Sequence, residues 1–121
     1  MLSKKNRVDK KEIDLIFKKG RFVGSQNLTL KFFINLDKTK EKKISFITPK
    51  SVSKKAVIRN LLRRRGYAVL EKYMKQFPVA ILGVFIFNKK STEFFGGRKN
   101  KKYKPILNLE NEIKNILNKI N

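Results

Sequence analysis

The chain has 121 residues, of which 40% are hydrophobic, enough to form the core of a single domain. Its 31 lysines and arginines against 9 acidic residues give a formal net charge of +22, which predicts a polyanionic partner, either nucleic acid or an anionic membrane surface. Having no cysteine and no histidine, it lacks disulfides, thiolate metal sites and the commonest general base. With no signal-peptide core and no apolar run long enough for a bilayer, we expect a cytoplasmic protein.

The first part of the chain predicts one helix followed by strands. Asp9 is expected to cap a helix, with Glu12 completing a capping box and Gly20 ending the helix. Residues 28–36 alternate between the two faces of a half-buried strand, and residues 43–49 repeat this pattern. Between these strands we expect a polar hairpin loop over 35–43.

The rest of the chain predicts a basic helix, a buried strand and a final helix. The basic helix is expected from about Ser53. Its expected apolar side consists of Val57, Ile58, Leu61, Leu62, Ala68 and Val69. Residues 79–87 are continuously apolar, which suits a central strand buried on both faces. Residues 88–105 are expected to form a mobile basic loop, and helical spacing from Leu109 to Ile120 predicts an amphipathic helix. The order indicates one α+β domain over 1–121.

The basic helix carries its positive charges with almost no acidic partners. Lys55, Arg59 and Arg63 follow each other four residues apart on one side. Like charges at this spacing weaken an isolated helix by a few tenths of a kcal/mol per pair. Arginine also offers a forked set of donors suited to phosphate oxygens. The cluster therefore favours phosphate binding over a merely solvated face, whereas for the lysines of 89–104 a solvated face is an equal alternative.

Residues 51–73, SVSKKAVIRNLLRRRGYAVLEKY, resemble the signature helix of the bacterial ribonuclease P protein family. The matching residues are Lys54, Lys55, Ala56, Val57, Arg59, Asn60, Arg63, Arg64 and Arg65. The segment NRVDKKEIDLIFKKGRFV is similar to the family's opening, so the resemblance covers roughly 6–87. It implies a sandwich similar to domain 2 of ribosomal protein S5, with a sheet of about four strands and a left-handed βαβ crossover.

The resemblance also implies a function and its contact residues. The protein would be a subunit of ribonuclease P, the endonuclease that removes the 5′ leader from precursor tRNA and whose catalytic part is RNA. Expected contacts to that RNA are Lys50, Lys54, Lys55, Arg59, Asn60, Arg63, Arg64 and Arg65, with Asn6 and Arg7 at the N-terminus. Expected leader-binding residues are Ile13, Phe17, Thr29 and Lys31. For Phe17, a place in the core is an equal alternative.

The chain shows no paired carboxylate cluster that would hold Mg²⁺ for hydrolysis. Asp9 and Glu12 are better explained as helix-capping groups. We therefore expect no catalytic residue, metal or cofactor on the protein, with Mg²⁺ bound by the RNA subunit. The expected partners are ribonuclease P RNA and precursor tRNA, without DNA or membrane. The alternative is a ribosomal or RNA-chaperone protein, which would bind RNA without stimulating cleavage.

Overall fold

A computed structural model describes residues 7–34, 41–96 and 104–120 of the chain. The elements are, in chain order, α1 (Lys10–Lys19), β1 (Arg21–Gly24), β2 (Leu28–Ile34), β3 (Lys43–Ile47), α2 (Ala56–Tyr73), η2 (Met74–Gln76), β4 (Ile81–Phe87), α3 (Ser91–Phe95) and α4 (Pro105–Ile120). They confirm the predicted α+β class and the four-stranded sheet.

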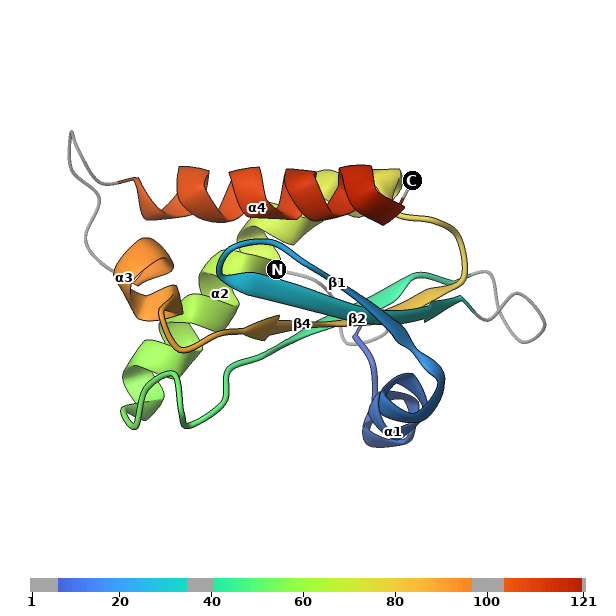
Figure 1. Ribbon diagram of the computed structural model, residues 1–121, viewed down its shortest axis with the longest axis horizontal. Helices are drawn as coiled ribbons and strands as arrows, with labels where there is room; N and C mark the ends of the chain where they lie inside the picture. The colour runs from blue at the N-terminus through green and yellow to red at the C-terminus, as the bar shows by residue number, and fades with distance from the viewer. Residues whose placement is uncertain (1–6, 35–40, 97–103, 121) are drawn as a thin grey trace.

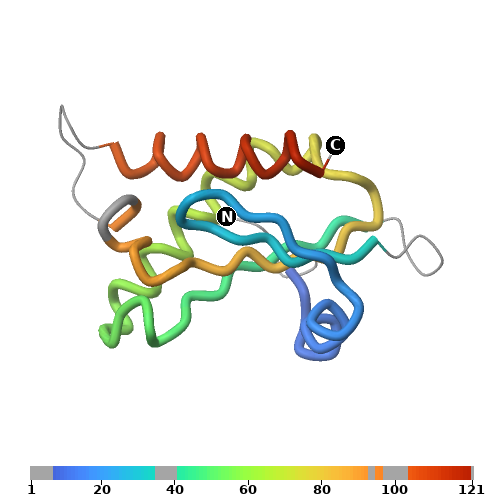
Figure 2. Tube along the Cα trace, in the orientation of Figure 1, coloured from blue at the N-terminus to red at the C-terminus, as the bar shows by residue number. Residues whose placement is uncertain are grey.

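The sheet is mixed, with the strand order β1-β2-β4-β3. β2 pairs with β1 and β4 in the antiparallel sense, whereas β3 and β4 are parallel neighbours. Figure 2 follows the chain from β3 through α2 into β4, which makes this pair a βαβ unit. The predicted hairpin between β2 and β3 is wrong, because β4 lies between these two strands and pairs with both.

Helices lie on both faces of the sheet. α2 and α4 cover one face, and α1 packs on the other (Figure 1). The alternation of β2 follows from this arrangement, because Leu28, Leu30 and Phe32 are buried beneath α2 and α4 while Thr29 and Lys31 point to the side of α1. β4 is buried along nearly its whole length, as the continuous apolar run predicts.

The boundaries of α1 follow the predicted local signals. The Asp9 side chain accepts a hydrogen bond from the Glu12 backbone N–H at 2.8 Å, and the Glu12 carboxylate accepts one from the Asp9 N–H at 2.9 Å. This reciprocal pair is the expected capping box. At the other end, Gly20 donates its N–H to the Ile16 carbonyl at 2.7 Å. A Cβ at Gly20 would lie 2.4 Å from that same oxygen, so only glycine fits.

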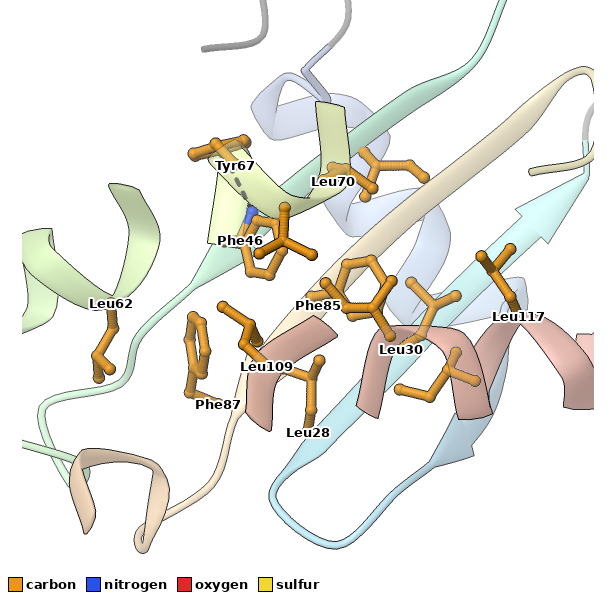
Figure 3. Close-up of a cluster of buried hydrophobic side chains, with 14 of the residues drawn as sticks. Leu28, Leu30, Phe46, Leu62, Tyr67, Leu70, Phe85, Phe87, Leu109 and Leu117 are labelled. Carbon is orange, nitrogen blue, oxygen red and sulfur yellow. Dashed lines mark hydrogen bonds between the residues drawn. The ribbon is translucent and has the colours of Figure 1, made fainter. Parts of the chain in front are cut away.

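Aromatic rings fill the core between the sheet and α2. The Phe46 ring of β3 stacks on Phe85 and Phe87 of β4, with centroids 5.0 and 5.5 Å apart (Figure 3). Tyr67 of α2 meets Phe46 edge-on at 5.1 Å, and its hydroxyl accepts a hydrogen bond from the Phe46 N–H at 3.1 Å. α2 can approach this closely because Gly66 has no side chain there. Packing against Phe46 therefore determines the position of α2 on the sheet.

The predicted apolar side of α2 is only partly correct. The helix begins at Ala56 rather than Ser53, and Val57 is 70% exposed. Ala68 is also exposed. The buried residues of α2 are Leu62, Gly66, Tyr67, Val69 and Leu70. The first turn and a half therefore contributes nothing buried, because only the later part of the helix packs on the sheet and on α4.

Three elements were not predicted from the sequence: β1, the short helix η2 and α3. β1 is four residues long, too short for a clear alternating pattern. α3 lies within the predicted loop over 88–105, and its Phe95 is fully buried, so this part of the prediction is wrong. Residues 97–103 of the same loop lie outside the described ranges. None of the helices in the described part of the chain is long and apolar enough to span a bilayer.

Candidate RNA-binding surfaces

The start of α2 places positive charge where the helix dipole is also positive. Lys55 is the N-cap residue and Lys54 precedes it; both are exposed, and the first turn contains no acidic residue. Lys50 is exposed in the turn before them. A cation at this end costs a helix roughly 0.3–1 kcal/mol. A bound anion would offset that cost, because the first N–H groups and the lysines would both face it.

A pocket lies beside the next turns of α2. Its lining residues are Arg7, Asn60, Arg63, Arg64 and Tyr67. The Arg7 guanidinium lies over the Tyr67 ring, 4.6 Å from its centroid, in a cation–π contact. Arg63 donates a hydrogen bond to the Asn60 side-chain oxygen. We call this the arginine pocket: three guanidinium groups line it, and its lining, as far as the structure describes it, holds no carboxylate. Such a set suits a phosphate.

The pocket unites two groups of residues that the sequence predicts separately. Arg7, expected as an N-terminal RNA contact, lies against the helix that carries the expected contacts to the catalytic RNA. Asn6, the other expected N-terminal contact, lies outside the described residues. Tyr67 was not predicted to take part; its ring supports the arginine from beneath.

Two of the predicted arginines also make contacts within the protein. Arg59 is half-buried, and its Nη1 donates to the Ser53 carbonyl at 2.9 Å, which ties the first turns of α2 to the preceding segment. Arg65 donates to the Phe95 carbonyl at the end of α3. Both guanidinium groups thereby hold backbone carbonyls through one of their nitrogens.

On the opposite face of the sheet, α1 and β2 place two predicted residues together. Phe17 is 44% exposed, so it is not a core residue. The ammonium of Lys31 lies 4.8 Å from the Phe17 ring centroid and donates to the Phe17 carbonyl at 3.4 Å. Thr29 is half-buried two residues along β2 on the same face. Ile13 differs from these three, since it packs partly buried against the small core beneath α1.

One exposed residue near this pair was missed. Phe22 of β1 is 73% exposed and lies directly across the strands from Lys31. We name Phe17, Phe22, Thr29 and Lys31 together the α1-side surface. A strand of four residues is too short for its sequence pattern to show which face Phe22 occupies. The polar run from Gly24 to Asn27 is a turn signal, however, and it could have indicated that β1 pairs with β2.

Several of the described acidic residues serve structural roles. No group of three or more histidine, cysteine, aspartate or glutamate residues that could hold a metal occurs in the described part of the chain. Glu12, besides its capping role, pairs with Lys43 at 3.2 Å. Glu110 of α4 accepts a hydrogen bond from the Tyr73 hydroxyl of α2. This bond, followed by burial, raises the pKa of Tyr73 above its ordinary value of 10.0, because the hydroxyl would lose the hydrogen bond on ionising.

Comparisons with known proteins agree with this geometry. The sequence profile of the family described as Ribonuclease P matches residues 2–120. No curated protein sequence matches significantly. The solved RNase P protein from Thermotoga maritima aligns with a TM-score of 0.78 at 21% identity, covering 95% of this chain and 97% of that chain. Staphylococcus aureus RNase P protein aligns with a TM-score of 0.75 at 16% identity, covering 95% and 94%. At these identities the structural matches bear on the fold alone, and the profile shows the family.

Proposed function

The chain belongs to the ribonuclease P protein family, and is a subunit of the enzyme that matures the 5′ end of tRNA; from this premise we propose which surface meets which RNA. The arginine pocket and the start of α2 bind phosphates of the ribonuclease P RNA. The α1-side surface binds the single-stranded 5′ leader of precursor tRNA. Family membership also sets aside the alternative of a ribosomal or RNA-chaperone protein.

The arginine pocket is the observation that carries the first assignment. Its three guanidinium groups, those of Arg7, Arg63 and Arg64, come from two segments far apart in the sequence and line one pocket. Holding like charges this close is unfavourable in the free protein. A phosphate would both relieve the repulsion and accept their hydrogen bonds. The exposed Lys54 and Lys55 extend the same positive surface toward the start of α2.

The chemistry of Phe17 and Lys31 supports the second assignment. An unpaired base can stack on the half-exposed ring of Phe17, because every base has a π-face, and the neighbouring ammonium can meet a phosphate. A mature tRNA has no leader to place there. The two surfaces lie on different faces of the protein, so one molecule can hold the catalytic RNA and the leader together.

We place Mg²⁺ on the RNA subunit. The carboxylates of Asp9 and Glu12 are engaged in the capping box, which leaves them poorly suited to ligate a metal. When bound to the RNA, Mg²⁺ would supply the activated water and the charge neutralisation that phosphodiester hydrolysis needs. The contribution of this chain is positive charge between two polyanions, together with a grip on the leader.

Arg64→Ala tests the assignment of the arginine pocket. Arg64 is exposed, so its removal should leave the melting temperature almost unchanged. Affinity for ribonuclease P RNA should fall, and the slope of log affinity against log salt should become shallower by about 0.7–0.9 for each phosphate that the variant no longer binds. Lys72→Ala is the matched control, because Lys72 is exposed on the last turn of the same helix. The measurement is a salt titration of RNA binding.

An unchanged salt slope for Arg64→Ala would remove the pocket from the RNA interface, as would an equal change for Lys72→Ala. Arg59→Ala is unsuitable for this purpose. Its guanidinium holds the Ser53 carbonyl, so a weaker complex would not distinguish the removal of a phosphate ligand from a loosened helix start.

A further inference from the structure

Phe22 is the most exposed large hydrophobic residue in the described part of the chain. It belongs to neither core cluster, and 73% of it remains accessible on the edge strand β1. A ring left in water forgoes the stabilisation that burial of an aromatic side chain normally brings. Its place in the fold therefore has to be explained by something other than packing.

The register of β1 on β2 aims Phe22 toward the α1-side surface. Phe22 lies opposite Lys31, and residues opposite each other in an antiparallel pair project from the same face. Lys31 in turn reaches the ring of Phe17, with its ammonium 4.8 Å from the centroid. Lys31 thus has one exposed ring, Phe17, beside its ammonium and another, Phe22, directly across the strand pair on the same face. Arg21, the neighbour of Phe22, points to the other face, where it lies over Phe32.

The next position along this face leaves room for a ligand. Gly24 is opposite Thr29, so the strand pair carries only a glycine and a small side chain there. A Cβ at Gly24 would meet its nearest neighbours only at ordinary contact distances of 3.5 and 3.7 Å, so the backbone there is not crowded. Because Gly24 and Thr29 are small, no large side chain occupies this position beside Phe22, and a planar group can lie against its ring there.

We propose that Phe22 is a second stacking position, so that the α1-side surface takes two unpaired nucleotides of one RNA strand. One base stacks on Phe17, another on Phe22, and the Lys31 ammonium meets a phosphate between them. Lys31 uses one donor on the Phe17 carbonyl, and an ammonium has three. Stacking tolerates any base, so the pair discriminates leader length rather than leader sequence. This inference rests on the proposed leader assignment.

A second copy of the protein is the competing occupant, because β1 is an edge strand with one unpaired side. The charge of the chain argues against it. At +22, two copies repel each other, whereas a single-stranded polyanion is attracted to the lysine between the rings. Single-stranded RNA is therefore the occupant that the surface suits.

The test uses holoenzyme assembled with Phe22→Ala and precursor tRNAs whose leaders lengthen one nucleotide at a time. Binding of long-leader precursors should weaken roughly five- to 150-fold, the range that corresponds to the loss of one base stack. Mature tRNA and a one-nucleotide leader should bind as they do to the unmodified holoenzyme. Phe22→Tyr should keep the affinity because it keeps the ring. Phe22→Leu should lose it, since leucine keeps only apolar bulk.

Control variants separate this inference from the proposed function. Val79→Ala alters another exposed apolar residue, 53% exposed, and should change nothing. If Phe17→Ala weakens leader binding and Phe22→Ala does not, the second stacking position is wrong while the leader assignment stands. If neither variant matters, both are wrong. An equal loss for mature tRNA, or an effect confined to self-association of the free protein, would also overturn the role of Phe22.

Discussion

Gly66 shows at the scale of one residue why α2 can lie so close to the sheet. A Cβ added at this position would come within 2.6–2.8 Å of three atoms of the Phe46 ring. That ring cannot move away freely, because it is stacked on Phe85 and Phe87 and met edge-on by Tyr67. The glycine is therefore required by tertiary packing, although in the middle of a helix it costs roughly 0.5–1 kcal/mol relative to alanine.

Gly66→Ala gives this packing a test with a defined sign. Helix propensity alone predicts stabilisation, whereas overpacking against Phe46 costs roughly 1–3 kcal/mol. We expect the packing cost to prevail, so the free energy of unfolding should fall, as measured by denaturant titration. Gly24→Ala is the control, because an added Cβ there makes only ordinary contacts. A more stable Gly66→Ala variant would show that the Phe46 ring yields.

At the scale of elements, a buried carboxylate joins α4 to the turn between β1 and β2. Glu112 is 9% exposed. One of its oxygens accepts the Asn27 N–H at 2.7 Å and the Ser25 hydroxyl at 2.5 Å, and the other accepts the Asn27 side-chain amide at 3.1 Å. Asn27 also binds the start of α3, since its carbonyl accepts the Ser91 hydroxyl at 2.9 Å. The turn is therefore the point where α4, β1–β2 and α3 are held together.

Glu112→Ala should lower the free energy of unfolding by roughly 1.5–3 kcal/mol, because it leaves the buried donors of Asn27 and the half-buried Ser25 hydroxyl without their charged acceptor. Asn111→Ala is the matched control, being exposed and one residue away on the same helix. Thermal and denaturant unfolding of both variants would measure the difference. Equal stabilities would mean that water replaces the carboxylate and that the tie contributes little.

α2 has two parts with different roles. Its early turns carry exposed or pocket-lining basic residues, and its later turns carry the residues buried against the sheet and α4. Arg59 and Arg65 connect the helix to neighbouring segments by donating hydrogen bonds to backbone carbonyls. The helix can therefore hold its charged part in place through the packing of its apolar part, which offsets the mutual repulsion of the charges.

For the whole molecule, charge and chemistry point to a protein that assists an RNA. The chain has no histidine, and three of the described carboxylates, Glu12, Glu110 and Glu112, are occupied by capping, a tyrosine and a buried turn. We predict that the RNA-free protein does not cleave precursor tRNA at any Mg²⁺ concentration. Added to its cognate RNA, it should raise cleavage at moderate Mg²⁺, because its charge lowers the repulsion between two polyanions.

A leader-cleavage assay with nuclease-treated protein measures both parts of this prediction. Metal-dependent cleavage that survives nuclease treatment would place catalytic groups on the protein. The control is the Arg64→Ala variant, which should need more protein for the same stimulation while remaining inactive alone. A stimulation independent of the protein's basic residues would contradict the electrostatic explanation.

The sequence by itself determined the features that depend on near neighbours. The capping box of Asp9 and Glu12 needs residues three apart, and the alternation of β2 needs only a period of two. The apolar run of β4 predicted its central place, and the segment from Lys54 to Arg65 was specific enough to indicate the family that the profile match shows. Each of these signals is local and does not depend on how the rest of the chain folds.

Tertiary structure alone decided the direction of individual side chains and the order of the strands. The sequence groups Arg65 with the other RNA-contact arginines, but the fold brings the Phe95 carbonyl, 30 residues away, within reach of its guanidinium. Arg7 reached Tyr67, and Phe22 came opposite Lys31, only because distant segments pair in the fold. A helical or strand period specifies a face, whereas hydrogen-bond partners and neighbours across a sheet come from parts of the chain that no local pattern contains.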